Sequence, residues 1–290
     1  MLSLLAPAKV NLVLEVVERR ETFHTISSIA QTIDLCDRLL VEAADGVRLT
    51  CNEPALEQDN IVTRAACLLR TRFGVQAGAR IHLEKRIPWS AGLGGGSSDA
   101  AAALRALNEL WHLDLTNEQM CSIGVELGSD VPLFLIGGTV LVQGRGEVVS
   151  RLGDHPTAYA VVMAPNGVTP AGKTGLMYRQ LRPEMFTLGQ FVRAAQFALE
   201  QGGRIPEELM FNVFEKVVEG VFPRIADNRA RLERAAGVRA HLAGSGPCLY
   251  ALLSSMAAAE SAAATLGDFD GRTFVTRMPG PETSAQSAVA

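Results

Sequence analysis

The stretch that decides the fold is Ala91-Gly-Leu-Gly-Gly-Gly-Ser-Ser98. Glycine has no Cβ atom, so the backbone N–H groups of such a run can approach and surround an anion. Apolar residues recur at helical spacing over 100–111, which places the stretch just before a helix. The positive end of that helix dipole would add to the attraction for phosphate. The stretch therefore predicts a phosphate-binding loop between a strand and a helix.

The residues that follow the glycines suit both a helix start and a phosphate site. Ser97, Ser98 and Asp99 are all good N-cap types, so one of them is expected to cap the helix. The hydroxyls of Ser97 and Ser98 can also donate to phosphate or reach a magnesium ion.

Other types of glycine loop fit less well. A Walker A loop needs a lysine directly after its glycines, and none follows here. A Rossmann loop needs a third glycine where this chain has Ser97, and it follows a fully buried strand, whereas residues 81–87 alternate with polar ones. A flexible glycine turn remains possible, but three consecutive glycines before a capped helix argue against it. The sequence favours a phosphate loop of neither named type.

Working outward from the loop, the hydrophobic periodicity predicts a mixed α and β chain. Strands are expected over 8–17, 29–42, 47–51, 81–87, 159–163, 238–242, 249–253 and 272–278. Helices are expected over 60–73, 100–111, 116–128, 186–201, 206–219, 225–236 and 256–266, with a short one at Pro132. We predict one domain over 1–153, a second over 154–280 and a flexible tail over 281–290.

Composition narrows the class of protein. Of the 290 residues, 48% are hydrophobic and 20% charged, and the net charge is -4, which gives no basic excess for binding nucleic acid. The five cysteines are odd in number and widely spaced, so we expect neither a disulfide framework nor a zinc site. Cys67 and Cys121 lie in apolar helical patterns and are predicted to be buried. We expect a cytoplasmic protein with no signal peptide, no membrane span and no obligate protein partner.

Three motifs in order along the chain resemble those of the GHMP kinases, which include galactokinase, homoserine kinase, mevalonate kinase and phosphomevalonate kinase. They are Ala6-Pro-Ala-Lys-Val-Asn-Leu12, Pro88-Trp-Ser-Ala-Gly-Leu-Gly-Gly-Gly-Ser-Ser-Asp-Ala100 and Leu242-Ala-Gly-Ser-Gly-Pro-Cys248. The resemblance implies an α+β fold of two domains, with ATP and substrate in the cleft between them. The N-terminal α/β domain would resemble domain 2 of ribosomal protein S5, and the C-terminal α+β domain would be ferredoxin-like.

Further segments narrow the resemblance within the family. They are Arg19-Arg20 before Phe23-His24, Gln31-Thr-Ile-Asp-Leu35, Asn60-Ile-Val-Thr-Arg-Ala-Ala66, Leu107-Asn-Glu-Leu-Trp111 and Leu127-Gly-Ser-Asp-Val-Pro-Leu-Phe134. They are similar to members that phosphorylate the 2-hydroxyl of a cytidine-diphosphate-linked methylerythritol, a small molecule of the non-mevalonate isoprenoid route. ATP and magnesium are the implied cofactors, with the metal ligands unassigned. A kinase for homoserine or mevalonate, and a catalytically silent nucleotide-binding relative, are the alternatives.

The resemblance assigns the chemistry to Asp130 and Lys9. Asp130 would accept the proton of the attacking hydroxyl, although an aspartate before Pro132 also suits a plain helix cap. Lys9 would keep Asp130 ionised and stabilise the oxygen as it becomes negative, although it also suits a surface position at a strand start. Asn11 lies on the same strand face by period two and would orient Lys9 or the substrate.

The resemblance also assigns the binding residues. Phe23 and His24 would read the cytosine, with Tyr178 on the other face of the base and Thr174 touching the substrate. The family pattern Asp-Gly-Tyr-His is here the shorter Glu21-Thr-Phe-His24. Each residue also suits a purely structural position: Phe23 in the core, His24 in a loop, Thr174 at a helix start and Tyr178 as a partly buried ring. The implied ATP-binding residues, with Asn60 and Lys85 at the adenine, are Asn60, Lys85, Pro88, Ala91, Gly92, Leu93, Gly94, Gly95, Gly96, Ser97 and Ser98.

Three further expectations concern single residues. Asn60 also suits a helix N-cap, and Lys85 also suits a solvated strand position. Ser245 and Gly246 are expected to shape the phosphate-donor site. Asn212 is similar to a family asparagine, but Val213 follows it where the family has aspartate, so no role is assigned to it.

Overall fold

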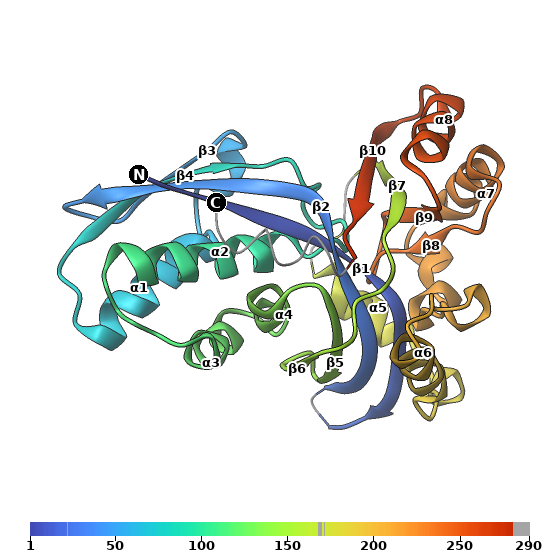
Figure 1. Cartoon of the computed structure of the whole chain (residues 1–290), viewed down its shortest axis with the longest axis horizontal. Coiled ribbons are helices and arrows are strands. Elements are labelled where there is room, and N and C mark those ends of the chain that lie inside the picture. The colour runs from blue at the N-terminus through green and yellow to red at the C-terminus, as the bar shows by residue number, and fades with distance from the viewer. Residues whose placement is uncertain (22, 168–169, 171, 281–290) are drawn as a thin grey trace. The chain divides into compact units, whose positions relative to one another are not determined.

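The computed structural model describes residues 1–21, 23–167, 170 and 172–280 (Figure 1). The predicted tail over 281–290 lies outside these residues. The chain forms two compact units. The first unit contains Met1–Ala8, Leu35–Trp89 and Gly94–Gly137, and the second contains Lys9–Asp34, Ser90–Leu93 and the described residues from Gly138 onward. The domain boundary predicted at residue 153 stays a prediction.

Two long paired strands, β1 (Leu2–Arg19) and β2 (His24–Ala44), contribute residues to both units. In the first unit the second half of β2 pairs antiparallel with β4 (Gly78–Glu84), and β3 (Arg48–Cys51) pairs parallel with β4. The helices of this unit are α1 (Ile61–Phe73), α2 (Gly95–Leu110), α3 (Asn117–Leu127) and α4 (Val131–Ile136), after a short 3₁₀ helix at Pro54–Leu56. α2 packs against the other three helices. Its buried face, which runs from Ala100 to Leu107, consists mostly of alanine residues.

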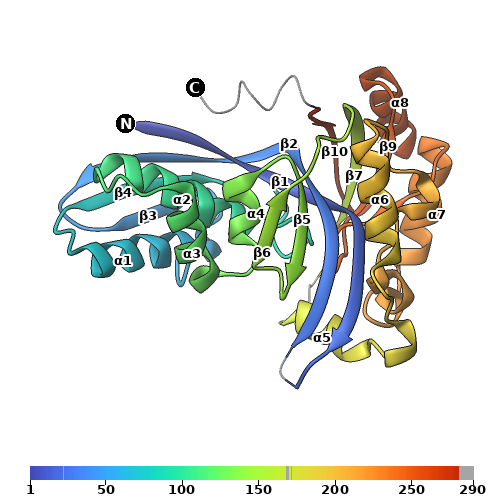
Figure 2. The same ribbon diagram turned by 60° about the horizontal axis from the view of Figure 1, so that its bottom comes forward.

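In the second unit the first half of β2 pairs with β5 (Thr139–Gly144), and β5 pairs with β6 (Val148–Arg151). A separate antiparallel sheet has the order β10 (Gly271–Met278), β7 (Ala158–Pro165), β9 (Leu249–Leu253), β8 (His241–Leu242). Helices α7 (Ile225–Ala236) and α8 (Met256–Leu266) lie along this sheet (Figure 2). Helices α5 (Lys173–Gln180) and α6 (Gln190–Glu200) complete the unit.

Most of the predicted elements are present, and several ends lie where the sequence signals placed them. Thr116 and Gln119 form the predicted capping box at the start of α3, and Gly128 follows its last residue. Gly237 ends α7 in the left-handed conformation, with φ of 68°. Asn60 is the N-cap of α1, and its side chain accepts from Val62 N at 2.9 Å.

The predicted start of α2 is wrong. Gly94 is the N-cap, with φ of 75°, and Ser97, Ser98 and Asp99 lie inside the first turns of the helix. A glycine adopts this left-handed conformation without the Cβ clash that a serine or aspartate would meet. The helix therefore begins within the glycine loop, and its free N–H groups belong to the loop itself.

The predicted helix over 206–219 is also wrong. The segment forms three short 3₁₀ helices, Glu207–Leu209, Val213–Lys216 and Val218–Gly220. Asn212 interrupts it, because this residue is extended, with φ of -131° and ψ of 115°, and its backbone bridges to Leu14 of β1. A long-range pairing of this kind overrides local helical periodicity.

Other differences concern single elements and cysteines. Strands β5 and β6 and helix α5 were not predicted as separate elements. Cys67 is exposed and Cys121 half-buried, whereas Cys51 and Cys248 are buried. Across the described residues, no helix is both long and apolar enough to cross a membrane.

Candidate active site

The glycine loop, residues 91–98, meets a second glycine segment, residues 243–247, which we call the glycine turn. A Cβ atom built on Gly92 would lie 2.0 Å from the carbonyl oxygen of Ala243, and Gly92 has φ of +91°. A Cβ on Gly244 would lie 2.8 Å from the carbonyl oxygen of Gly92. The N–H of Cys248 donates to the carbonyl of Ala91 at 3.2 Å. Only glycine fits this backbone approach, which explains the glycines at positions 92 and 244.

Lys9 lies beside these two segments. It is buried on β1, its backbone N–H donates to Leu93 O at 2.9 Å, and its Nζ lies 3.0 Å from the Cβ position built on Gly244. The Nζ donates to Oδ1 of Asn11 at 2.6 Å, and Nδ2 of Asn11 donates to Oγ of Ser28 at 2.9 Å. The structure thus brings Lys9 and Asn11 together as the period-two spacing predicts, and it places a fixed cation beside the glycine loop.

Asp130 occupies the N-cap position of α4, but its side chain makes no capping hydrogen bond. Pro132 stands in the first turn of the helix, where it needs no N–H partner, and the N–H of Val131 donates to the carbonyl of Gly128 at 3.1 Å. The half-buried carboxylate is therefore not used for capping, which leaves its oxygens available for another task.

Lys85 is buried, so it does not occupy the solvated strand position that the sequence also allowed. The side chain is 5% exposed and its Nζ forms ion pairs with Asp37 and with Asp99, the latter at 2.7 Å. Oδ1 of Asp37 also accepts from the N–H groups of Arg86 at 2.5 Å and Ile87 at 2.8 Å. The residues before the glycine loop are therefore linked, through Lys85 and Asp37, to Asp99 on α2, the helix that follows the loop.

This buried cluster holds one cation between two carboxylates. Burial raises the pKa of Asp99 to about 8, with the charge of Lys85 opposing this effect and that of Asp37 adding to it. Burial alone would lower the pKa of Lys85, but Asp99 and Asp37 more than offset it and raise that pKa. The cluster therefore holds the charge on Lys85 and shifts Asp99 toward its protonated form.

The donors near the loop fit a magnesium ion only in part. Oγ of Ser98 is buried and has no hydrogen-bond partner among the described residues, so it suits a hard cation. Asp99 does not suit one, because the Lys85 ammonium 2.7 Å from its Oδ2 would repel a metal ion. In the described part of the chain, no group of three His, Cys, Asp or Glu side chains could hold a metal.

An aromatic group lies around His24. The rings of His24 and Tyr178 stack with centroids 4.9 Å apart and 21° between their planes. Phe186 meets His24 edge-on at 5.9 Å, and Phe214 meets Tyr178 edge-on at 4.9 Å. Burial lowers the pKa of His24, and the charge of Arg19 lowers it further, so this ring is neutral at neutral pH.

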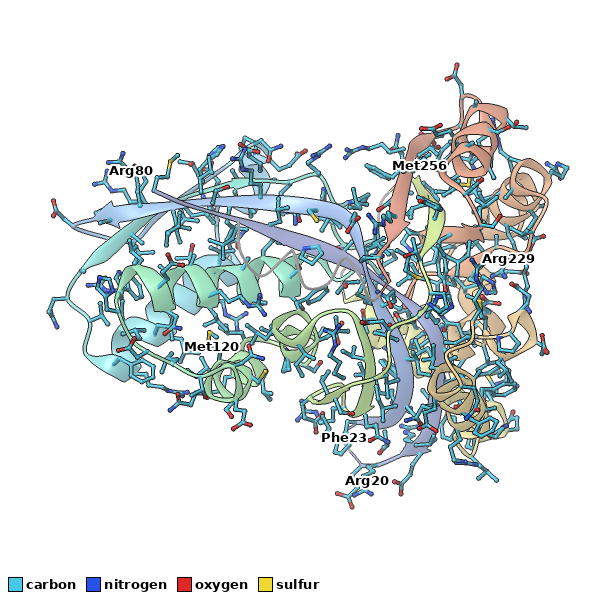
Figure 3. The ribbon with its side chains drawn as sticks, viewed as in Figure 1. Arg20, Phe23, Arg80, Met120, Arg229 and Met256 are labelled. Atoms are coloured by element: carbon cyan, nitrogen blue, oxygen red, sulfur yellow. The ribbon has the colours of Figure 1, made fainter. Side chains whose placement is uncertain are left out.

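Phe23 does not join this group. Figure 3 shows it with Arg20 at the turn between β1 and β2, and the guanidinium of Arg145 lies 5.6 Å from its ring centroid. Phe186 and Phe214, by contrast, were missed by sequence reasoning. Phe186 follows one short 3₁₀ helix and Phe214 lies within another. Both fall in the helices predicted over 186–201 and 206–219, and a helical pattern does not show which rings meet.

The remaining predicted residues are placed as follows. The hydroxyls of Thr174, in the first turn of α5, and Ser245, in the glycine turn, are 3.2 Å apart. The side-chain amide of Asn60 donates to Leu56 O at 2.6 Å while its oxygen caps α1, so both of its ends contact backbone.

Two further residues hold the glycine turn, a role that the sequence did not assign to either of them. Nδ2 of Asn212 donates to the carbonyls of Leu242 at 2.9 Å and Gly244 at 2.8 Å. Nζ of Lys173 donates to the carbonyl of Gly246, and also to that of Ser90 at 3.1 Å. A lysine next to the predicted substrate residue Thr174 was the signal for Lys173. Asn212 was noted for its similarity to a family asparagine, but no role was assigned to it.

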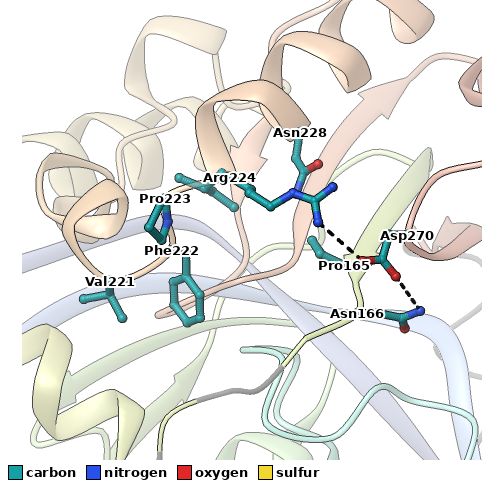
Figure 4. Close-up of a pocket in the computed structure, with 9 residues that line it drawn as sticks. Pro165, Asn166, Val221, Phe222, Pro223, Arg224, Asn228 and Asp270 are labelled. Atoms are coloured by element: carbon teal, nitrogen blue, oxygen red, sulfur yellow. Dashed lines mark hydrogen bonds and ion pairs between the residues drawn. The ribbon is translucent and has the colours of Figure 1, made fainter.

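A pocket elsewhere on the second unit does not coincide with these residues (Figure 4). Its polar groups bind one another, since Asp270 accepts from Asn166 at 3.2 Å and pairs with Arg224 at 3.4 Å. The lining residues are Pro165, Asn166, Val221, Phe222, Pro223, Arg224, Ile225, Asn228 and Asp270.

The chain is similar to known proteins over most of its length. The family model for the GHMP kinases N terminal domain matches residues 60–138, and that for the GHMP kinases C terminal matches 194–270. A 4-diphosphocytidyl-2-C-methyl-D-erythritol kinase of Dehalococcoides mccartyi is 41% identical over 90% of this chain and 92% of that protein. One from Exiguobacterium sibiricum is 38% identical over 95% and 97%.

Solved structures agree with these relatives. A crystal structure of 4-(cytidine 5'-diphospho)-2C-methyl-D-erythritol kinase matches with a TM-score of 0.82 and 37% identity, covering 97% of this chain and 100% of that chain. Homoserine kinase from Cytophaga hutchinsonii matches with a TM-score of 0.76 at 20% identity over 96% and 94%, which shows a shared fold alone.

Proposed function

Because the chain belongs to the GHMP kinase family, we propose that it transfers the γ-phosphate of ATP to the 2-hydroxyl of 4-diphosphocytidyl-2-C-methyl-D-erythritol. Near full-length similarity to enzymes of that name carries the proposal, at 41% and 38% identity. The chain is thus an ATP-dependent small-molecule kinase with the mixed α+β GHMP fold. Its reaction serves isoprenoid precursor synthesis by the non-mevalonate route.

We assign the proton transfer to Asp130. The attacking hydroxyl oxygen forms a bond to the γ-phosphorus while the bond from that phosphorus to the bridging oxygen breaks, and ADP leaves. The proton of the hydroxyl passes to the Asp130 carboxylate. The observation that supports this role is the missing cap bond, since the side chain stands at a helix start without serving it.

Lys9 supplies positive charge to the same reaction. Asn11 and the backbone of Leu93 hold it in place, so its ammonium needs no rearrangement when charge develops on the reacting oxygens. A cation fixed in advance stabilises a transition state more than a mobile surface lysine does. This fixed geometry supports a catalytic role over a surface position at a strand start.

The glycine loop binds the phosphates through backbone N–H groups at the start of α2, where the helix dipole also favours an anion. Gly94, Gly95 and Gly96 present this backbone without side chains in the way. Magnesium neutralises charge on the β- and γ-phosphates when bound. Ser98 is the residue we expect to contact it, with ATP and water as the other ligands.

We place the cytosine at the aromatic group. His24 can hydrogen-bond the edge of the base, because its ring is neutral, and Tyr178 offers a stacking face. Phe23 and Thr174 stay predicted substrate contacts, and Asn60 and Lys85 stay predicted adenine contacts. The ion pairs of Lys85 favour an indirect part for its side chain, through the position of the loop.

The compartment is also a proposal. Cys51, Cys67, Cys121 and Cys248 are free thiols, which suits a reducing cytoplasm. The expected absence of nucleic-acid and obligate protein partners stays a prediction.

ADP formation with three acceptors tests the main proposal. The purified protein is expected to turn over 4-diphosphocytidyl-2-C-methyl-D-erythritol and to leave homoserine and mevalonate unphosphorylated. Turnover of homoserine or mevalonate alone would favour the other kinase types. ATP binding without turnover of any acceptor would identify a silent relative.

A further inference from the structure

Lys173 is a buried cation that the reaction as described does not use. It is the first residue of α5, and the residue as a whole is 7% exposed. Its Nζ donates to the carbonyl of Ser90, at 3.1 Å, and to that of Gly246. Ser90 directly precedes the glycine loop and Gly246 belongs to the glycine turn. One ammonium therefore joins the two glycine segments.

The hydrogen-bond partners that the structure gives Lys173 are neutral carbonyls. The ionisable groups that act on it are Lys9, of β1, and the thiol of Cys248, just after the glycine turn. Burial, and after it the positive charge of Lys9, lower the pKa of Lys173 to about 8. Burial raises the pKa of the Cys248 thiol to about 12, so this group stays neutral.

A lysine buried on carbonyls beside another lysine is costly unless something negative joins it. Desolvation penalises the ammonium, and neutral acceptors offset the penalty only in part. An apolar side chain of the same length would fill the space without this cost. An anion that arrives between the glycine segments would supply the missing negative charge, and phosphate is the anion that both segments are shaped to accept.

We propose that Lys173 is a positioning residue for phosphoryl transfer, which fixes the glycine loop to the glycine turn and adds a second positive charge beside Lys9. The role rests on the proposed kinase function. It differs from that of Lys9, because Lys173 acts through the backbone of two loops. The nucleotide phosphates are the ligand whose binding it prepares.

Replacement by methionine tests the proposal. Lys173→Met keeps the length of the side chain and removes its charge and its donors. We expect kcat/KM for ATP to fall about 30-fold, which is less than the loss for a donor that contacts the reacting group because Lys173 acts through the backbone, with the KM of the cytidyl acceptor changed less than about threefold. The matched control is Lys216→Met, which removes an exposed lysine that also donates to a carbonyl, that of Met185. The control is expected to keep wild-type kinetics.

Thermal melting separates this role from a structural one. The folded protein binds the Lys173 proton less tightly than the unfolded chain does, so losing the charge removes a penalty at neutral pH. We expect Lys173→Met to melt within a few degrees of the wild type, the relief of that penalty offsetting the two lost hydrogen bonds. A large drop in melting temperature with unchanged kinetics would overturn the proposal.

The pH dependence of kcat/KM for ATP is a measurement that a purely structural role of Lys173 would not change. In the wild type kcat/KM for ATP is expected to fall as pH rises through about 8, where Lys173 loses its proton. This limb should be absent in Lys173→Met, and in Lys173→Arg it should move above pH 10 because arginine stays charged. If the methionine variant does not fold, the arginine profile still decides. An unshifted limb in Lys173→Arg contradicts the proposal.

Calorimetry with ADP distinguishes a failed inference from a failed kinase assignment. ADP binding needs no acceptor, so it is measured whether or not the cytidyl compound turns over. We expect Lys173→Met to bind ADP about tenfold more weakly than the wild type and Lys216→Met to match the wild type. Equal affinity in all three proteins would reject the role of Lys173 while leaving the acceptor assignment intact.

Discussion

Asp99 on α2 and Lys85 just after β4 form an ion pair of 2.7 Å in which both side chains are at most 5% exposed. The pair has a third member, because Lys85 also contacts Asp37. With two carboxylates and one ammonium, the cluster would carry a surplus negative charge if every group were ionised. The raised pKa of Asp99, about 8, follows from its burial and this surplus.

Asp99→Asn is expected to flatten the dependence of stability on pH. The pKa of Asp99 rises from 3.8 when unfolded to about 8 when folded, so between these values the folded protein holds a proton that the unfolded chain lacks. Stability from this group is therefore present below pH 4 and is lost as pH rises through 8. Between pH 6 and 9 the wild type should lose on the order of 2 kcal/mol relative to Asp99→Asn. Urea unfolding at both pH values measures this, and parallel curves would mean that Asp99 is already ionised at pH 6.

Asp130→Asn is expected to lower kcat by at least about 1,000-fold while ATP still binds, because the amide cannot accept the hydroxyl proton. Its melting temperature should match the wild type, since the side chain makes no cap bond. Thr116→Ala is the matched control, because it removes a helix cap that is formed and should cost about 1 kcal/mol of stability without changing kcat. Near-normal turnover by Asp130→Asn would leave Asp130 as a plain cap residue.

His24→Ala is expected to raise the KM for the cytidyl acceptor at least about tenfold and the KM for ATP less than about twofold. The stacked ring of Tyr178 loses its partner, and the base loses a hydrogen bond. Phe274→Ala is the comparison, because this ring also lies beside an arginine, Arg272, but outside the aromatic group and the predicted substrate contacts. Steady-state kinetics of both variants measure the contrast. Equal changes in the two KM values for His24→Ala would remove its assigned role.

Gly92→Ala is expected to abolish ATP binding or folding, because the new methyl would meet the carbonyl oxygen of Ala243 at 2.0 Å and strain a φ of +91°. Gly220→Ala serves as the control, since nothing lies within 4 Å of its Cβ position. ADP binding and thermal melting measure both. A Gly92→Ala protein that binds ADP normally would show that the two glycine segments need not touch.

The sequence predicts those parts of the molecule whose signals are local. The capping box at Thr116 and the glycine after α7 act over a few residues, and both were confirmed. The strand predicted over 81–87 is present but ends earlier, as Gly78–Glu84. The start of α2 was not predicted, because three serine and aspartate residues have the chemistry of a cap while Gly94 has the backbone conformation.

The rest of the site depends on contacts between distant residues. The pairing of Asn11 with Lys9 follows from strand period, so sequence reasoning found it. Lys85 contacts Asp37, 48 residues away in the sequence, and Lys173 contacts Gly246, 73 residues away. No periodic pattern in the sequence indicates contacts at such separations. Motif resemblance named the family, and only the fold shows which lysines are buried and what they hold.

The hydrogen bonds of Asn212 restrict which changes of sequence the chain can accept during evolution. Among the described residues, the hydrogen bonds of its side chain are to main-chain atoms: the carbonyls of Leu242 and Gly244 and the N–H of Phe214. A main-chain partner is present whichever side chain stands there. Replacements at positions 242 and 214 can therefore drift without breaking these bonds, whereas an inserted or deleted residue shifts the carbonyls out of reach. These hydrogen bonds are thus expected to tolerate a change of side chain but not a change of length, while burial still restricts Leu242 and Phe214.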